Sequence, residues 1–152
     1  MVFEGELVIV LNEPYDREEC LAFSKTVFEF PAATLVLCNI PPSSAKTVEE
    51  VNLVATTLGR SVLSVPHWRE VVEMFRPEKT FYFDHKVKRH IEAGKLSEPL
   101  KADKAVVIVF GSAPVKGMDH IGLSHELSLP AAVSIVLYLI EEALNPTGPL
   151  NL

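Results

Sequence analysis

Short apolar runs alternate with amphipathic segments along most of this 152-residue chain, and that alternation is the strongest guide to its fold. Six such runs cover residues 6–11, 33–38, 61–65, 79–83, 105–110 and 126–129. Several are apolar at every position, which is typical of strands covered by helices on both faces. Strands that alternate with helices form a mostly parallel sheet. The sequence therefore predicts one α/β domain over residues 1–152, with about six strands, helices on both faces and a flexible tail at 145–152.

Three of the connecting segments carry clear helix signals. The first helix is expected between residues 16 and 27. The second is expected to begin with a capping box, in which Thr47 and Glu50 satisfy backbone groups of the first turn, and to stop at Gly59. The third carries Trp68 on its apolar face. Trp68 is therefore predicted to be a core residue and not a platform on which bases stack.

Residues 84–104 show the least regular pattern. Val87 suggests a turn or two of helix, and residues 95–104 look like a polar connection. Loops at the carboxyl ends of parallel strands are where α/β proteins bind ligands. We therefore expect a functional loop here, in which Asp84 and His85 could form a general acid–base pair.

The formal net charge of −6 argues against binding nucleic acid by bulk electrostatic attraction, because phosphate contacts need Lys and Arg. Residues 69–104 are the exception, with 9 basic and 7 acidic groups. Lys86, Lys88, Arg89 and His90 lie close together within this segment. This basic cluster could contact phosphates or could be an ordinary solvated helix face.

Neither a membrane span nor a secretion signal is predicted. The longest nearly uninterrupted apolar run, at 129–140, is shorter than the ~20 residues that cross a bilayer. The amino terminus shows no basic segment or cleavage site typical of a signal peptide. Cys20 and Cys38 fit neither a disulfide framework nor a zinc site, so we interpret both as buried apolar residues. The expected location is the cytoplasm.

Three glycines, Gly111, Gly117 and Gly122, follow the fifth apolar run within twelve residues. Glycine lets the backbone take positive φ and approach a ligand closely, so this loop could wrap an adenine or a phosphate. The spacing fits neither the phosphate-binding pattern G-x-x-x-x-G-K nor the dinucleotide fingerprint G-x-G-x-x-G. The glycine loop is therefore a candidate ligand site of another kind.

The parts around this loop follow in a definite order. A strand at 106–110 ends in Gly111, a loop with Lys116-Gly117 and Ile121-Gly122-Leu123 follows, and Leu127-Ser128-Leu129 leads into an Ala/Val-rich helix from residue 131 to 138. This order resembles that of the SPOUT superfamily of S-adenosylmethionine-dependent RNA methyltransferases, which have the α/β-knot fold. Upstream, the helix at 48–59 is similar to an early helix of that family.

The resemblance implies a C-terminal trefoil knot, in which backbone groups of three loops bind S-adenosylmethionine in a bent shape. The cofactor-binding positions that it implies are Phe83, Gly111, Ser112, Gly117, Ile121, Gly122, Leu127, Leu129 and Ala131. The adenine is expected against Leu127 and Leu129. No metal cofactor is implied.

Two positions depart from the family's pattern. Ser128-Leu129-Pro130 stands where the family has Ser-Leu-Asn, and residues 48–58 lack the arginine that ribose-methylating members carry in their early helix. Arg60 is the nearest substitute. The candidates for positioning the methyl acceptor are Arg60, His85, Arg89 and Ser128, and the acceptor could be a base nitrogen or a ribose hydroxyl.

The last helix predicts the assembly. Residues 131–140 are apolar on nearly every face, and such a helix must be covered on both sides. One side can pack on the sheet, which leaves the other for a second subunit. We therefore predict a homodimer through helix 131–144 with Val136 in the interface. The resemblance points the same way, because the family's sites are generally completed by a second subunit.

The favoured function is S-adenosylmethionine-dependent methylation of tRNA or rRNA. Two other interpretations remain: a non-catalytic α/β dimer that serves as a scaffold for a nucleotide or protein partner, and an unrelated flavodoxin-like or Rossmann-like binding domain. A metal site built from Asp119, His120 and His125 is a further alternative. The path of the chain after Phe110 distinguishes the folds. A chain that threads through an earlier loop favours the knotted fold, and an ordinary right-handed crossover favours the flavodoxin-like or Rossmann-like one.

Overall fold

The computed structural model describes residues 5–88, 91–112 and 117–145. Its elements are β1 (Leu7–Asn12), α1 (Arg17–Phe28), β2 (Ala33–Cys38), α2 (Ala45–Thr57), β3 (Val62–Val65), α3 (Trp68–Phe75), β4 (Lys79–Phe83), α4 (Ala93–Lys101), β5 (Val106–Gly111), β6 (Asp119–Ile121) and α5 (Leu129–Leu144). All six strands are parallel and form one sheet in the order β3-β2-β1-β5-β4-β6. The predicted parallel α/β sheet is confirmed.

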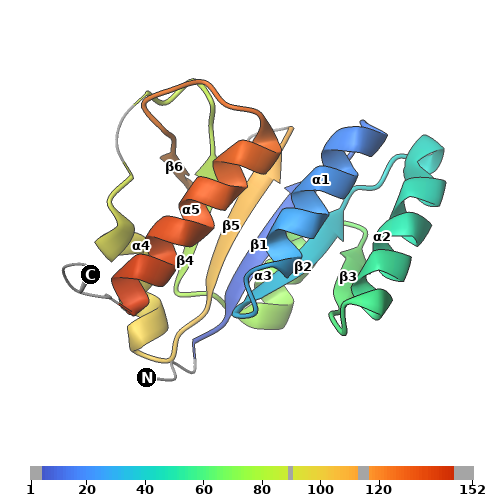
Figure 1. The fold of residues 1–152 in the computed structure, drawn as a ribbon. Helices are drawn as coiled ribbons and strands as arrows, with labels where there is room; N and C mark the ends of the chain where they lie inside the picture. Colours follow the sequence, from blue (N-terminus) through green and yellow to red (C-terminus); the bar gives the residue numbers. More distant parts are fainter. Residues whose placement is uncertain (1–4, 89–90, 113–116, 146–152) are drawn as a thin grey trace, which may run out of the picture.

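The sheet carries helices on both faces, as predicted (Figure 1). α4, α5, α1 and α2 lie side by side over one face, and α3 covers the other. Ile9 and Leu11 of β1 point toward the four-helix side, and Val8 and Val10 point toward α3. Because both faces are covered, β1 is buried at every position, which explains its continuously apolar sequence.

Capping residues set several helix ends. Asp16 caps α1, because its Oδ1 accepts the backbone N–H of Glu19 at 2.8 Å. Ser128 caps α5 in the same way, and Pro130 occupies the first turn of that helix. Gly59, with φ of 67°, follows the end of α2 in the left-handed conformation that glycine favours. The expected bounds of the first helix and the expected stop at Gly59 are confirmed.

The predicted start of the second helix is wrong. α2 begins at Ala45 and directly continues a short 3-10 turn over Pro42–Ser44. Thr47 is therefore inside the first turn, where its side chain is buried and does not cap the helix. The chain enters α2 through the turn, and the T-x-x-E pattern has no capping role.

Two predictions for the second half of the chain are also wrong. The sixth strand covers Asp119–Ile121, and residues 126–128 lead into α5. Residues 95–104 are not a polar connection, because most of them belong to α4. Leu96 and Leu100 lie on one side of this helix and are buried in the main core, so tertiary packing outweighs the helix-breaking effect of Gly94 and Pro99.

The side chains predicted to be core residues are buried or partly buried. Trp68 packs partly buried against the cluster on the α3 face of the sheet. Cys20 and Cys38 are both free and buried. Burial raises the pKa of the Cys38 thiol to about 12, so this thiol stays neutral and behaves as an apolar group.

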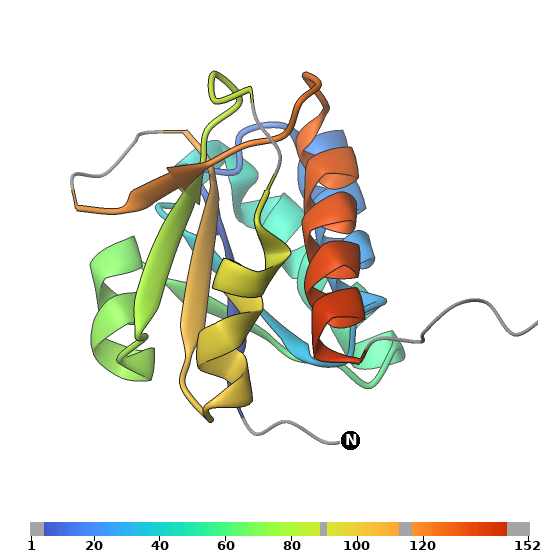
Figure 2. The ribbon, with the colours of Figure 1, turned by 90° about the vertical axis from the view of Figure 1, so that its left-hand side faces the viewer.

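The chain after β5 takes an indirect path back to the core. β5 lies between β1 and β4, β6 then pairs with the outer edge of β4, and α5 returns to pack between α1 and α4. On this return, the segment before α5 crosses the loop that follows β4 (Figure 2). The crossing is tight at Gly122, where a Cβ atom would collide with the carbonyl oxygen of Val87.

The position of α5 also corrects the predicted interface. Val136 is fully buried in the core of the single chain and cannot be an interface residue. α5 is apolar on most faces because the sheet, α1 and α4 cover three of its sides. In the described part of the chain, no helix is both long enough and apolar enough to cross a membrane.

Candidate site at the carboxyl edge of the sheet

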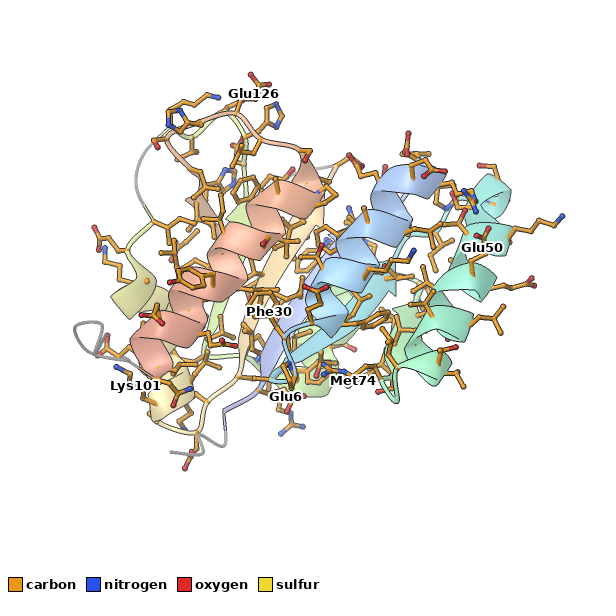
Figure 3. The ribbon with its side chains drawn as sticks, viewed as in Figure 1. Glu6, Phe30, Glu50, Met74, Lys101 and Glu126 are labelled. Carbon is orange, nitrogen blue, oxygen red and sulfur yellow. The ribbon has the colours of Figure 1, made fainter. Side chains whose placement is uncertain are left out.

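Loops from five strands meet where those strands end, and we call this region the carboxyl edge. It comprises the described residues 12–15, 39–41, 84–88, 111–112 and 122–128. Figure 3 shows Glu126 at this edge, whereas Glu6 and Lys101 lie toward the opposite one. The carboxyl edge of a parallel sheet is the usual place for a ligand.

Hydrogen bonds join the ends of β1, β2 and β5. The buried Asn12 side chain donates from Nδ2 to the carbonyl oxygen of Ser112 at 2.6 Å and accepts at Oδ1 from Asn39 Nδ2 at 2.6 Å. Ser112 Oγ donates to Glu13 Oε2 at 2.7 Å. Glu13 and Asn39 have positive φ of 54° and 48°, a conformation that is uncommon outside glycine and concentrates at functional sites. This network fixes the start of the loop after β5.

Two of the loop glycines are explained by close contacts within the chain and not by the approach of a ligand. Gly111 has φ of 111°, and a Cβ atom there would collide with the carbonyl oxygen of Asn12. Gly122 allows the crossing with Val87 described above. Both glycines are needed because two backbone segments of the same chain approach closely. Gly117, with φ of 93°, differs in that a Cβ atom there would meet no described atom within 4 Å.

Asp84, the first residue after β4, links its own loop to β6. Its Oδ1 accepts the backbone N–H of Lys86 at 2.9 Å, and its Oδ2 lies 3.1 Å from His120 Nδ1. The Lys86 N–H, followed by the His120 ring, lowers the pKa of the Asp84 carboxyl below its usual value, so Asp84 is ionised at neutral pH. The side chain of Asp84 is 19% exposed, and that of His120 is 37% exposed.

Tyr82 joins this pair to the loop after β5. Its ring meets the His120 ring edge-on, with 5.3 Å between ring centroids, and its hydroxyl donates to the carbonyl oxygen of Gly111 at 2.7 Å. Burial raises the pKa of Tyr82, which keeps the phenol protonated as a donor. The sequence pairs Asp84 with its neighbour His85. It does not reveal His120, because the contact depends on the register that places Tyr82 opposite His120.

Apolar side chains line the segment that returns from β6 to α5. Ile121, Leu127 and Leu129 are half-buried against the main core, and Phe83 below them stacks on Phe110 with 5.2 Å between ring centroids. Ala131 begins α5, where Ser128 accepts its N–H. Half-buried apolar side chains beside backbone donors and acceptors suit an adenine ring, so the residues present fit the implied cofactor.

The structure brings most but not all of the predicted site residues to this edge. The residues at or beside it are Gly111, Ser112, Ile121, Gly122, Leu127 and Ser128, and the exposed His85 lies in the loop after β4. Gly117 does not lie at this edge, because it precedes β6 at the amino end of that strand. Arg89 lies outside the described residues. Arg60 is at the opposite edge, where its Nη2 donates to the carbonyl oxygens of Phe30, Pro31 and Ala33 at 3.2, 3.3 and 3.1 Å. Its guanidinium therefore ties α2 to the start of β2.

The alternative metal site does not form. His120 turns toward Asp84, away from a shared centre with Asp119 and His125. Among residues 5–88, 91–112 and 117–145, no group of three or more His, Cys, Asp or Glu side chains is placed to hold a metal ion.

No protein-family model matches the sequence, and no curated protein sequence matches it at a significant level. Solved structures do match. A probable methylase family protein from Haemophilus influenzae is 17% identical with a TM-score of 0.68, over 91% of this chain and 64% of its own. A candidate RNA methyltransferase from Bacillus anthracis is 15% identical with a TM-score of 0.69, over 96% of this chain and 99% of its own.

A third match is the A. aeolicus TrmH/SpoU tRNA modifying enzyme, at 12% identity and a TM-score of 0.62, over 94% of this chain and 77% of its own. The chain thus spans nearly the whole Bacillus protein but less than two thirds of the Haemophilus one. At such low identity, a structural likeness establishes the fold alone. With its six-stranded parallel sheet, the chain has the α/β fold of these methyltransferase structures.

Proposed function

We propose that the protein is an S-adenosylmethionine-dependent RNA methyltransferase of the SPOUT type, acting on tRNA or rRNA. The observation that carries the proposal is the likeness to methylase and RNA methyltransferase structures, among them a TrmH/SpoU enzyme, over more than nine tenths of the chain. The site supports it, because the carboxyl edge combines the backbone at Gly111 and Ser112, held by Asn12, with an apolar return segment. A tRNA or rRNA substrate fits the expected location in the cytoplasm.

The cofactor would be held by backbone groups of the loops at Gly111–Ser112 and Ile121–Gly122, with its adenine against Leu127 and Leu129. Bound S-adenosylmethionine supplies an activated methyl group. The protein's own residues hold the cofactor-binding loops in position. Asn12 holds the Ser112 carbonyl group in place before any ligand arrives, and Phe83 and Ala131 support the adenine site from β4 and α5.

The crossing of the return segment over the loop after β4 is, in our proposal, the point at which the chain forms the trefoil knot. The close approach of Gly122 to Val87 supports it, since the two segments pass each other at backbone contact distance. The ion pair between Lys88 Nζ and Glu126 Oε2, at 3.9 Å, links the same two segments.

We still place the homodimer interface on α5, but with contact residues other than Val136. Ile135 and Tyr138 are 39% and 56% exposed on the outer side of this otherwise covered helix. Exposed apolar side chains on one helix face suit a two-fold contact, in which the same patch is used by both subunits. We propose that these two residues lie in the interface.

The acceptor end of the reaction would lie at the same edge. His85, Ser128 and Arg89 are the proposed acceptor-positioning residues. Lys86 and Lys88 are exposed in the loop after β4 and would contact RNA phosphates. Arg60 is left out of this set because it binds carbonyl groups at the opposite edge.

Titration calorimetry of the ligand-free protein with S-adenosylmethionine and S-adenosylhomocysteine tests the proposal. We expect micromolar binding at one site per subunit. Leu127→Glu should abolish that binding by placing a charge against the adenine, whereas Leu58→Glu, at the exposed residue that follows α2, should leave it unchanged. Absence of binding to the folded wild-type protein would contradict the proposal and favour a non-catalytic scaffold.

A further inference from the structure

An open pocket lies beside the proposed cofactor site, at the carboxyl ends of β1, β2 and β3. Its volume is about 810 Å³, and these three strands are neighbours in the sheet (Figure 1). Within the described part of the chain, no lysine or arginine lines the pocket, and Glu13 adds a carboxylate to it. Because phosphate contacts need cations, a pocket of this charge suits a base of an RNA and not its phosphates.

Resting on the proposed function, we propose that this pocket binds a guanine that lies close to the methyl acceptor along the RNA strand. β2, at the centre of the pocket, is two strands away from β5, which at ~4.8 Å per strand is roughly 10 Å. The pocket is therefore too far from Gly111 and Ser112 to hold the acceptor itself. Contacts to nucleotides that flank a reacting base set the sequence preference of other nucleic-acid-modifying enzymes.

Glu13 connects the pocket with the loop after β5. Its Oε2 accepts from Ser112 Oγ at 2.7 Å and from the Tyr15 hydroxyl at 3.1 Å. Ser112 is a residue that we assign to the cofactor, whereas Tyr15 lines the pocket. One carboxylate thus contacts both sites, which places the bound guanine next to the methyl donor.

Two hydrogen-bond acceptors of the lining are available to a base. Both donors to the Glu13 carboxylate bind Oε2, and Oε1 accepts from no described residue. Asn39 donates through Nδ2 to Asn12 at 2.6 Å, and its Oδ1 likewise accepts from no described group. Guanine presents N–H donors at both N1 and N2 of its Watson–Crick edge, whereas uracil presents a single N–H. Available acceptors therefore favour guanine over uracil.

Tyr15 provides the surface on which the base would stack. It is 67% exposed, and Glu13 holds its hydroxyl, so its ring is both accessible and oriented. Pro41, Pro42 and Pro66 add apolar surface to the lining. Stacking on an aromatic ring tolerates every base. Tyr15 would therefore supply affinity for RNA, and the acceptors of Glu13 and Asn39 would supply the preference for guanine.

The fold holds the lining in place before any RNA binds. The Glu13 N–H donates to the Cys38 carbonyl oxygen at 2.9 Å, which joins the ends of β1 and β2. The Asn39 N–H donates to the Pro66 carbonyl oxygen at 3.1 Å, which joins the ends of β2 and β3. Glu13 and Asn39 are also the two residues of this edge with positive φ. A lining fixed in this way loses little conformational entropy on binding a ligand.

Fluorescence anisotropy with labelled single-stranded RNAs of about 12 nucleotides tests the preference without any methylation. One RNA contains only uridine, and the other has one guanosine at its centre. The wild type should bind the guanosine RNA at least about fivefold more tightly, the lower end of the discrimination that specific base contacts give. Inosine in place of guanosine lacks the N2 amino group and should reduce the preference. Equal affinity for the uridine and guanosine RNAs, or no binding of either, would overturn the proposal.

Variants assign the effect to the pocket. Glu13→Gln should abolish the preference for the guanosine RNA. Tyr15→Ala should weaken binding of both RNAs at least about fivefold, as expected for a lost stacking contact, whereas Tyr15→Phe should bind the uridine RNA as the wild type does. Leu53→Ala, at a residue of α2 that is 68% exposed, is the matched control and should bind both RNAs like the wild type. A folded Glu13→Gln protein that keeps the full preference would also contradict the proposal.

These measurements and the cofactor calorimetry separate the two proposals. If the wild type binds S-adenosylmethionine but shows no preference for the guanosine RNA, the guanine proposal is wrong and the proposed function stands. If the wild type binds no cofactor, the proposed function fails, and the claim that the guanine lies beside a methyl acceptor fails with it.

Discussion

Individual residues at the carboxyl edge act mainly by holding backbone in place. Asn12 bonds to groups from β2 and β5 at once, and Glu13 and Asn39 take left-handed conformations beside it. This arrangement requires glycine at position 111, because the backbone of β5 lies so close to the Asn12 carbonyl group that a Cβ atom would collide with it. Gly111 and Ser112, at the start of the loop after β5, are therefore held in place by the fold before any ligand binds.

Gly111→Ala is expected to lower the free energy of unfolding by more than about 2 kcal/mol. A positive φ costs an alanine ~1–2 kcal/mol, and the collision with Asn12 adds an overpacking cost of ~1–3 kcal/mol. Gly59→Ala is the matched control, since it also has positive φ but its Cβ would meet no described atom within 4 Å. Urea denaturation measures both. Equal losses in the two variants would show that the Asn12 collision is relieved at no cost.

The site residues that directly follow a strand were predictable from the sequence. Those that depend on which strands pair, and in which register, were not. Gly111 with Ser112 and the loop after Phe83 follow strands that the sequence reveals, so their arrival at one edge is predictable. The partner of Asp84 is not, because His120 lies 36 residues away and is positioned by a three-residue strand.

Single elements were predictable in proportion to how apolar they are. β2 and β4 have the predicted bounds because runs of buried apolar residues are hard to mistake. α4 and β6 were missed, since α4 contains Gly94 and Pro99 and β6 is short and only half-buried. Both are stabilised by packing against neighbours that the local sequence does not show.

Arg60 gives a prediction at this scale, because it joins two elements. Arg60→Ala removes the charged donor shared by three carbonyl groups and should lower the free energy of unfolding by about 1–3 kcal/mol. Arg60→Lys should lose less, since an ammonium can still reach part of the set. Urea denaturation and cofactor calorimetry, run together, distinguish stability from binding. A loss of cofactor affinity at unchanged stability would instead place Arg60 in the site.

On the scale of the whole molecule, the two edges of the sheet have different roles. The amino edge carries contacts that stabilise the fold, such as Arg60 on the start of β2. The carboxyl edge carries strained backbone, a buried amide and an ionised carboxylate. α5 connects the two edges. Its first turn lies at the carboxyl edge, and the rest of the helix packs between α1 and α4 in the core.

The proposed dimer is tested by two substitutions on α5 that differ in burial. Tyr138→Glu places a charge on the exposed outer side and should convert a dimer to a folded monomer in sedimentation experiments. Val136→Glu places the same charge in the core, where an unpaired carboxylate is costly, and should unfold the chain as judged by circular dichroism. A Tyr138→Glu protein that remains dimeric would move the interface away from this face of α5. A folded, monomeric Val136→Glu protein would mean that Val136 faces a second subunit instead of the core.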